Sequence, residues 1–247
     1  MKRTSVAVAA AGATALVVAA SYLSLTAVAL SVGALCVVAA VGWTHLLGVP
    51  ARKSQSAAIG LSALLAVSLT ALVPAPSFLA WFPACVALGV GAVFMIQLVR
   101  GTGQSFRLES TLGASSGVVA VGMGSGWVAT ERLAANATDS GMTLVTGVSI
   151  LVAIAVSLLP FPDRLIAPAA VALAALAGPL GALLFTDVPA LAAAVVGLVC
   201  GAVIAATRRL LIARGTPLPA LAAVSAGLTP VLAVGAVVYF LDGFFLA

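Results

Sequence analysis

The chain has 247 residues, of which 63% are hydrophobic and only 7% are charged. A soluble domain is roughly half apolar and a quarter charged, so this composition excludes a soluble globular protein. The net charge of +5 also raises the possibility of nucleic-acid binding, but the basic residues are scattered and form no patch that could follow a phosphate backbone. We therefore predict a single integral membrane domain over residues 1–247, surrounded by membrane lipids and without a nucleic-acid partner.

Apolar runs define the predicted membrane spans, because a helix needs about 20 apolar residues to cross the hydrocarbon core. The first run, 5–47, is roughly twice that length, so we divide it at its most polar point, between Ser21 and Ser24. The sequence thus predicts an all-α fold, a polytopic bundle of about nine transmembrane helices. The predicted spans are 5–22, 25–47, 57–74, 79–99, 110–129, 143–160, 166–186, 189–206 and 218–241.

The basic residues predict the orientation of these spans. With the N-terminus inside and the C-terminus outside, every basic residue except Arg132 falls in a cytoplasmic segment, as the positive-inside rule requires. The composition, rich in alanine, valine and glycine and poor in lysine, favours a bacterial protein, and we therefore expect it in the plasma (inner) membrane. An alternative for the N-terminus is a signal peptide cleaved at Ala27-Val28-Ala29, within residues 1–29, which would leave the other spans in the same orientation.

Aromatic residues fall at the predicted ends of the spans. Tyr22, Trp81, Trp127 and Tyr239 lie at outer boundaries and Trp43 lies at an inner one. Tryptophan and tyrosine are enriched at the membrane–water interface, so the sequence predicts an interfacial position for each of them.

Small residues are concentrated in the fifth predicted span, 110–129. Membrane helices approach closely where small residues face one another, so this span is predicted to lie centrally in the bundle. Glycines at four-residue spacing are the predicted helix-packing residues, namely Gly113, Gly117, Gly122 and Gly126, and Gly197 and Gly201 repeat the spacing in the eighth span.

The segment Gly113 to Gly117 also fits G-x-S-x-G, a pattern found around serine nucleophiles, and His45 is the only histidine that could serve as its base. That pattern belongs on a strand–turn–helix, whereas Ser115 lies inside an apolar helix, so we assign no catalytic residue. The acidic residues are dispersed along the chain and the cysteines lie in apolar runs. We therefore predict no metal site and no cofactor.

The segment from Arg100 to Arg107 is the most polar of the predicted cytoplasmic loops. Its two arginines and its glycine-freed backbone amides suit contact with an anionic lipid headgroup. The alternative is that the two arginines serve only to keep the loop inside.

The seventh and ninth spans share a pattern of prolines. Pro168 is followed eleven residues later by Pro179, and Pro219 is followed eleven residues later by Pro230. A proline in mid-helix removes a backbone hydrogen bond, and paired interrupted helices point to the binding site of a transporter. The predicted substrate path is formed by Gly178, Pro179, Thr229, Pro230 and Gln97.

These features favour a multi-pass permease or transporter for a small or lipidic solute. The main alternative is a non-catalytic membrane subunit or scaffold that packs against other membrane proteins or against a second copy of the chain. A shortage of polar residues in the spans supports that alternative, because a hydrophilic solute path needs such residues. A membrane-embedded enzyme acting on lipid is the third hypothesis.

Overall fold

The computed structural model describes residues 3–48, 51–74, 77–101, 106–136, 141–214 and 218–245, and within these ranges it contains ten α-helices and no strand. The helices are α1 Arg3–Ser21, α2 Leu25–Leu46, α3 Arg52–Leu72, α4 Phe82–Val99, α5 Arg107–Gly122, α6 Ser125–Asn136, α7 Met142–Ser157, α8 Asp163–Phe185, α9 Ala190–Arg214 and α10 Ala220–Phe245.

Eight spans are long and apolar enough to cross a membrane, with α5 and α6 together forming one of them. The shorter apolar helix α7 makes a ninth pass among the described residues. The protein is therefore a multi-pass helical membrane protein, and the prediction of about nine spans is confirmed.

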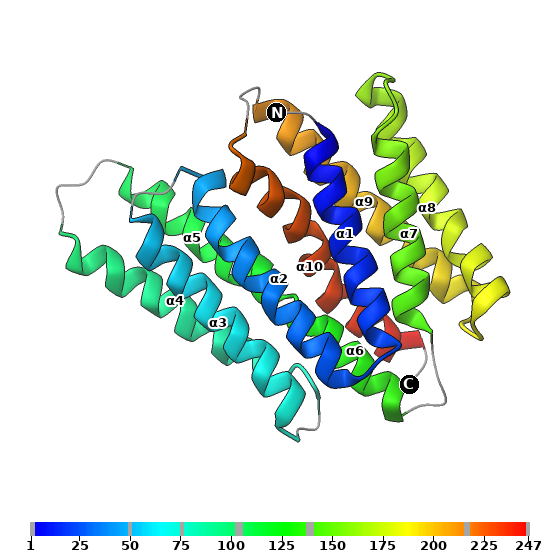
Figure 1. The fold of residues 1–247 in the computed structure, drawn as a ribbon, viewed down its shortest axis with the longest axis horizontal. Helices are drawn as coiled ribbons and strands as arrows, with labels where there is room; N and C mark the ends of the chain where they lie inside the picture. Colours follow the sequence, from blue (N-terminus) through cyan, green and yellow to red (C-terminus); the bar gives the residue numbers. More distant parts are fainter. Residues whose placement is uncertain are drawn as a thin grey trace.

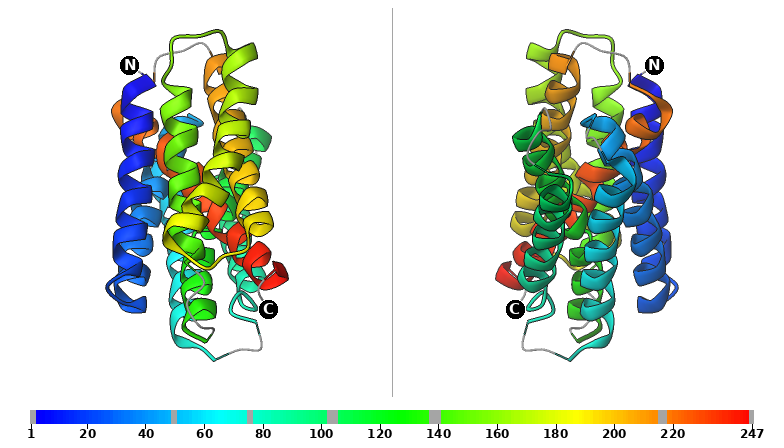
Figure 2. Two further views of the ribbon diagram at one scale, coloured as in Figure 1. Left: turned by 90° about the vertical axis from the view of Figure 1, so that its right-hand side faces the viewer. Right: turned by 90° about the vertical axis from the view of Figure 1, so that its left-hand side faces the viewer.

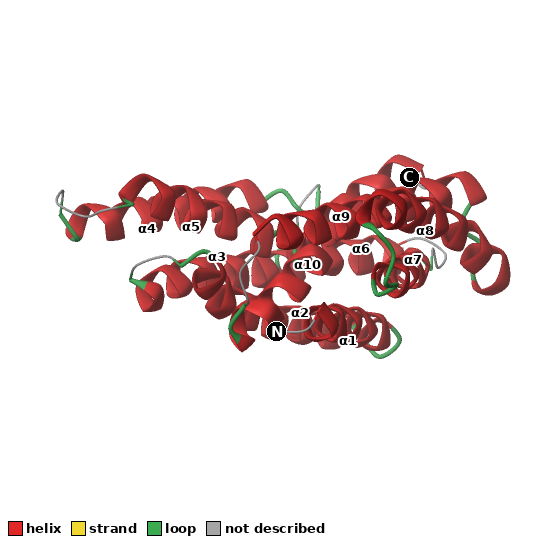
Figure 3. Cartoon of the chain, turned by 90° about the horizontal axis from the view of Figure 1, so that it is seen from above, coloured by secondary structure: helices red, strands yellow, loops and turns green. Residues whose placement is uncertain are grey.

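The helices run up and down the bundle, so the two termini lie at opposite ends (Figures 1 and 2). We call these the N end and the C end. Helices α3, α4 and α5 pack together on one side, and α7, α8 and α9 pack together on the other. Seen from above, α10 lies between the two groups (Figure 3). It contacts α1, α2, α6 and α9, and 78% of its apolar stretch is buried, more than in any other candidate span.

Two helices extend well beyond the ends of their apolar runs. Helix α9 continues to Arg214 rather than ending at residue 206, and α10 continues to Phe245 rather than residue 241. The hydropathy of the sequence falls where charged residues begin, and the predicted spans therefore end there. The helix itself continues, because these charged residues are paired or buried within the bundle. As a result Arg208 and Arg209 lie on α9, and Asp242 lies on α10.

The fifth span is broken, although the sequence predicted a continuous helix over 110–129. Helix α5 ends at Gly122 and α6 begins at Ser125. The amide of Gly124 donates to the carbonyl of Val121 (3.1 Å), and the hydroxyl of Ser125 donates to the carbonyl of Gly122 (2.9 Å). A Cβ atom on Gly124 would lie 2.8 Å from Leu232 Cδ2 and 3.1 Å from Cys36 Sγ, so a side chain at this turn would force these neighbours to shift.

Trp127 lies inside the bundle, with 1% of its surface exposed, so the prediction that it belongs to the interfacial belt is wrong. Its indole Nε1 donates to the carbonyl of Val231 on α10 (2.9 Å). A Cβ on Gly235, one turn further along, would lie 2.6 Å from the indole ring. The missing side chain of Gly235 thus leaves room for the ring, and the hydrogen bond satisfies the buried N–H.

Trp43 uses the same arrangement between α2 and α5. Its Nε1 donates to the carbonyl of Gly113 (2.8 Å), and a Cβ on Gly117 would lie 2.5 Å from the indole. The other two glycines of the predicted packing set lie at different contacts. Gly126 meets the backbone of Ala236 on α10, and a Cβ on Gly122 would lie 3.2 Å from the ring of Phe82.

Candidate functional site

A cavity of about 280 Å³ lies among α1, α7, α9 and α10, near the N end of the bundle. The residues around it come from the first turns of α1, the last turns of α7 and α9, and the first half of α10. Its walls are mostly aliphatic and include Val6, Ala10, Ile154, Ile204, Leu211 and Ala223. This composition suits an apolar chain or ring.

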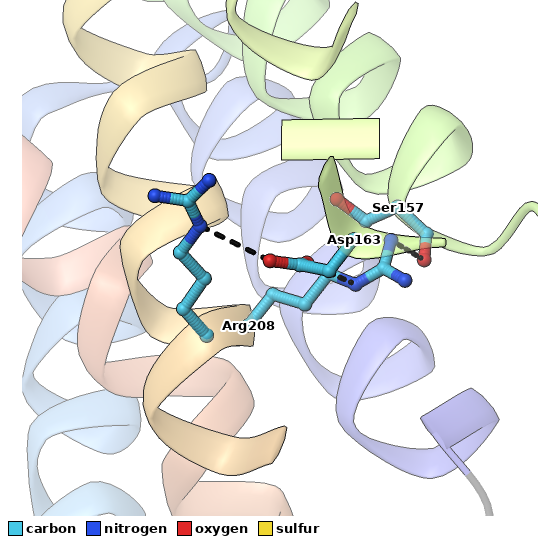
Figure 4. A network of polar contacts seen from close by, with 4 residues as sticks. Ser157, Asp163 and Arg208 are labelled. Atoms are coloured by element: carbon cyan, nitrogen blue, oxygen red, sulfur yellow. Dashed lines mark hydrogen bonds and ion pairs between the residues drawn. The ribbon is translucent and has the colours of Figure 1, made fainter. Parts of the chain in front are cut away.

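One part of the cavity wall is polar, because Arg208 of α9 contributes to it. The Arg208 side chain is 9% exposed, and its Nη1 donates to the carbonyl of Ser157 (2.9 Å). Its Nε lies 3.4 Å from Oδ1 of Asp163, the first residue of α8. Figure 4 shows Ser157 at the end of α7, Asp163 at the start of α8 and Arg208 on α9 lying close together.

Asp163 is shared between two arginines. Arg209 Nε donates to its Oδ2 (3.1 Å), while Arg208 faces Oδ1. Two guanidinium groups and one carboxylate leave a net positive charge beside the cavity. Arg209 is 60% exposed and is not part of the lining, so Arg208 is the charge presented to the cavity.

The Ser157 hydroxyl adds a second polar group to the cavity wall. It is buried and has no hydrogen-bond partner within the described part of the chain. Nearby, the hydroxyl of Thr207 donates to the carbonyl of Val203 (2.8 Å), within its own helix. A buried hydroxyl without a partner is unfavourable, so Ser157 is a suitable hydrogen-bonding group for a ligand.

Helix α10 forms one wall of the cavity at a point of close approach to α1. Gly227 packs against the backbone of Val6, and a Cβ there would also lie 3.0 Å from the amide of Ala10. Pro230, three residues later, lines the same cavity. Proline has no N–H, so the carbonyl of Ala226 loses its helical donor at this point. Helix α10 is continuous here but lacks this one backbone hydrogen bond where it borders the cavity.

The predicted substrate-path residues are not all brought together. Pro230 lines the cavity, and its neighbour Thr229 is buried and donates to the carbonyl of Ser225 (2.8 Å). Gly178 packs against Ala193 of α9. Pro179 follows it on α8, a helix that packs against α7 and α9, and neither residue lines the cavity. Of the two mid-helix prolines, Pro230 thus lines this cavity and Pro179 does not.

Gln97 also lies away from the cavity. Its Nε2 donates to the hydroxyl of Ser110 (2.7 Å), joining α4 to α5. Arg100 and Arg107, predicted to contact an anionic headgroup, stand on either side of residues 102–105, and that loop lies outside the described residues. The glycine pair Gly197 and Gly201 lies against α8, where Gly197 meets the carbonyl of Ala174.

The serine and histidine of the hydrolase hypothesis are not hydrogen-bonded to each other. The Ser115 hydroxyl has no hydrogen-bond partner in the described ranges. His45 Nδ1 lies 2.9 Å from the carbonyl of Val41, within α2. His45 lines a second hollow, of about 520 Å³, which is an apolar groove between α2 and α3 with Arg52 and Lys53 among its residues.

The polar group of Ser157, Asp163 and Arg208 was not predicted from the sequence. Asp163 and Glu109 are the two acidic residues in the predicted cytoplasmic segments, which are otherwise basic. Asp163 could therefore have suggested an ion pair with a basic residue of that side. Its partner could not be chosen among the basic residues of that side, because the order of the helices in the bundle was unknown.

Comparisons of the chain with protein-family models, with curated proteins and with solved structures found no match.

Proposed function

We propose that the protein is a permease for a small amphipathic solute with an anionic group, such as a single-chain lipid. The observation that carries this proposal is the cavity among α1, α7, α9 and α10, whose walls are mostly aliphatic, with Arg208 as the charged residue and Ser5, Ser157 and Thr207 as the neutral polar ones. An apolar tail would lie among the aliphatic side chains, and the anionic group would lie beside the guanidinium, with Ser157 as a further hydrogen-bonding group.

The same features disfavour a strongly hydrophilic substrate. A sugar or a free amino acid needs several polar contacts to replace its water, and the cavity offers few. An amphipathic solute removes this difficulty, because most of its surface is apolar. The proline inside α10, which removes one backbone hydrogen bond beside the cavity, also supports transport, since helices weakened by proline or glycine often border the binding site of a transporter.

The proposed setting is the plasma membrane of a bacterium, with the N end and the mouth of the cavity on the cytoplasmic side. This orientation is supported by the basic residues, since Arg52, Arg164, Arg208 and Arg209 belong to helix ends at the N end. An amphipathic solute would thus enter or leave the cavity at the level of the inner headgroups.

Transport is tested with a fluorescent lysophosphatidylglycerol as the probe, in vesicles that contain the purified protein. Movement of the probe between leaflets is followed by its protection from dithionite. We expect faster exchange than in protein-free vesicles, and slower exchange for the corresponding lysophosphatidylcholine, which has no net charge. Equal exchange with and without protein would contradict the proposal.

Two matched pairs of variants locate the path. Arg208→Gln removes the charge at the cavity and should weaken probe binding about tenfold, which corresponds to 1.4 kcal/mol. Arg209→Gln alters the same ion pair outside the cavity and should have little effect.

Ala7→Leu fills the cavity and should slow exchange, whereas Ala15→Leu on the exposed face of α1 should not. Equal effects within both pairs would place the path elsewhere.

A further inference from the structure

Asp242 has a buried carboxyl group, and the described residues offer it no hydrogen-bond partner. It lies near the end of α10, is 1% exposed, and neither of its carboxyl oxygens has a hydrogen-bond partner within the described part of the chain. An ionised carboxylate in such a place costs several kcal/mol unless a positive charge or a hydrogen-bond donor compensates it. The side chain must therefore be neutralised in some other way.

The neighbouring charges do not neutralise Asp242. Glu131 of α6 is close enough for its negative charge to act on Asp242, and its Oε1 accepts a hydrogen bond from Thr143 (2.6 Å). Arg132 is turned away, since its Nη1 donates to the last carbonyls of α3 (2.6 and 3.0 Å). Asp187 is exposed between α8 and α9.

The other helices packed on α10 bring no compensating charge to this place. The C-end residues of α1, α2, α5, α7 and α9 are uncharged, and Asp139 lies outside the described residues. Among the described residues, the charge that acts on Asp242 is thus that of another carboxylate, Glu131, and repulsion between the two adds to the cost of ionising Asp242.

A bound metal ion fits this site less well than a proton. Calcium and magnesium require six or more oxygen ligands, and one oxygen of Glu131 is already occupied by Thr143. Among the described residues, no three His, Cys, Asp or Glu side chains come close enough together to hold a metal ion. A proton needs a single carboxylate oxygen.

We propose that Asp242 is the proton-binding site of a proton-coupled carrier, an inference that rests on the proposed function. A carboxylate oxygen of Asp242 takes up one proton to give the neutral acid, and release of the proton restores the carboxylate. Asp242 follows Pro230 by twelve residues, about 18 Å along α10 at 1.5 Å per residue. One helix therefore carries the titrating group at the C end and the wall of the cavity at the N end.

Proton binding is tested on the purified full-length protein by infrared difference spectroscopy between about pH 5.5 and about pH 9. Exposed aspartates, with a pKa of about 3.9, are already ionised throughout this range. We expect the C=O band of one protonated carboxylic acid at the lower pH, shifted in D₂O and absent from Asp242→Asn. Asp187→Asn, which removes an exposed aspartate near the same end, should keep the band.

Three outcomes would overturn the inference. The first is a spectrum without such a band, and the second is a band that Asp242→Asn retains. The third is loss of the band when Na⁺ replaces K⁺, because sodium would then displace the proton and would be the coupling ion. These results are independent of lysophosphatidylglycerol exchange, so a failed transport assay with an intact Asp242 band would reject the permease and not the proton site. Coupling itself predicts that an inward proton gradient accelerates exchange in the wild type and not in Asp242→Asn.

Discussion

Several polar side chains link neighbouring helices of this apolar bundle, because each donates a hydrogen bond to a backbone carbonyl of another helix. Trp43 and Trp127 each place the indole over a glycine and donate to the carbonyl four residues before it. Arg132 donates to the carbonyls of Thr70 and Val73 at the end of α3, where a helix dipole favours a positive charge. This contact gives a physical reason for the only arginine predicted to lie outside the cytoplasm.

The role of Trp127 predicts a specific loss of stability. Trp127→Phe keeps an aromatic ring but removes the N–H, leaving the buried carbonyl of Val231 without its indole donor. We expect a loss of about 1–3 kcal/mol in the free energy of unfolding, measured by denaturation of the detergent-solubilised protein. Trp81→Phe is the control, because Trp81 is 47% exposed. A similar loss in both variants would contradict the structural role given to the Val231 hydrogen bond.

Among the helices, α10 combines the features that bear on function. It is the most buried candidate span, it borders the cavity with Ala226, Gly227 and Pro230, and it carries Asp242. Helix α8 contains a proline in the matching position, but it packs against α7 and α9 and contributes no residue to the cavity. A shared sequence pattern thus occurs in two different environments.

Pro230→Ala and Pro179→Ala separate these environments. Each replacement restores a helical N–H and relieves up to about 3 kcal/mol of helix propensity, so neither variant should be less stable than the wild type. We expect Pro230→Ala to slow the exchange of the lysophosphatidylglycerol probe, because the restored backbone hydrogen bond stiffens α10 where it lines the cavity. Pro179→Ala should exchange the probe at the wild-type rate. An equal decrease in the exchange rate of both variants would indicate that Pro179 also contributes to the substrate path. An unchanged exchange rate in both would exclude a functional role for the two prolines.

At the scale of the whole molecule, two three-helix groups flank a central set formed by α1, α2, α6 and α10 (Figures 1 and 3). The termini lie at opposite ends, as an odd number of passes requires. Which end faces the cytoplasm follows from the positive-inside rule and is open to a direct measurement.

The orientation predicts which engineered cysteines an impermeant thiol reagent reaches in intact cells. Ser54→Cys and Ile212→Cys lie at the N end and should be protected, whereas Ala135→Cys at the C end should be labelled. All three positions are exposed, so reactivity reports the side of the membrane. The wild type is the control, because Cys36, Cys85 and Cys200 are buried. Labelling of Ser54→Cys together with protection of Ala135→Cys would reverse the orientation.

The candidate site was only partly predictable. Pro230 was selected from its spacing and lines the cavity, but Gly178, Pro179 and Gln97, selected by similar reasoning, lie at other helix contacts. In the sequence, Arg208 is only one of the basic residues that predict the orientation, and Asp163 is only one of the dispersed acidic residues. The ion pair between Arg208 and Asp163 beside the cavity forms because α8 and α9 pack against each other. No local pattern of residues predicts which helices are neighbours.

An all-helical membrane bundle of about nine spans could be predicted from the residues of each segment, because the free energy of moving a segment into lipid is a sum over its own residues. Which side chains are buried depends instead on how the helices pack against one another. The spans are apolar on nearly all faces, so no amphipathic pattern marks the face that meets a neighbour. Burial of Trp127 and Asp242, the break between α5 and α6, and the cavity beside Arg208 arise from packing between helices distant in the chain.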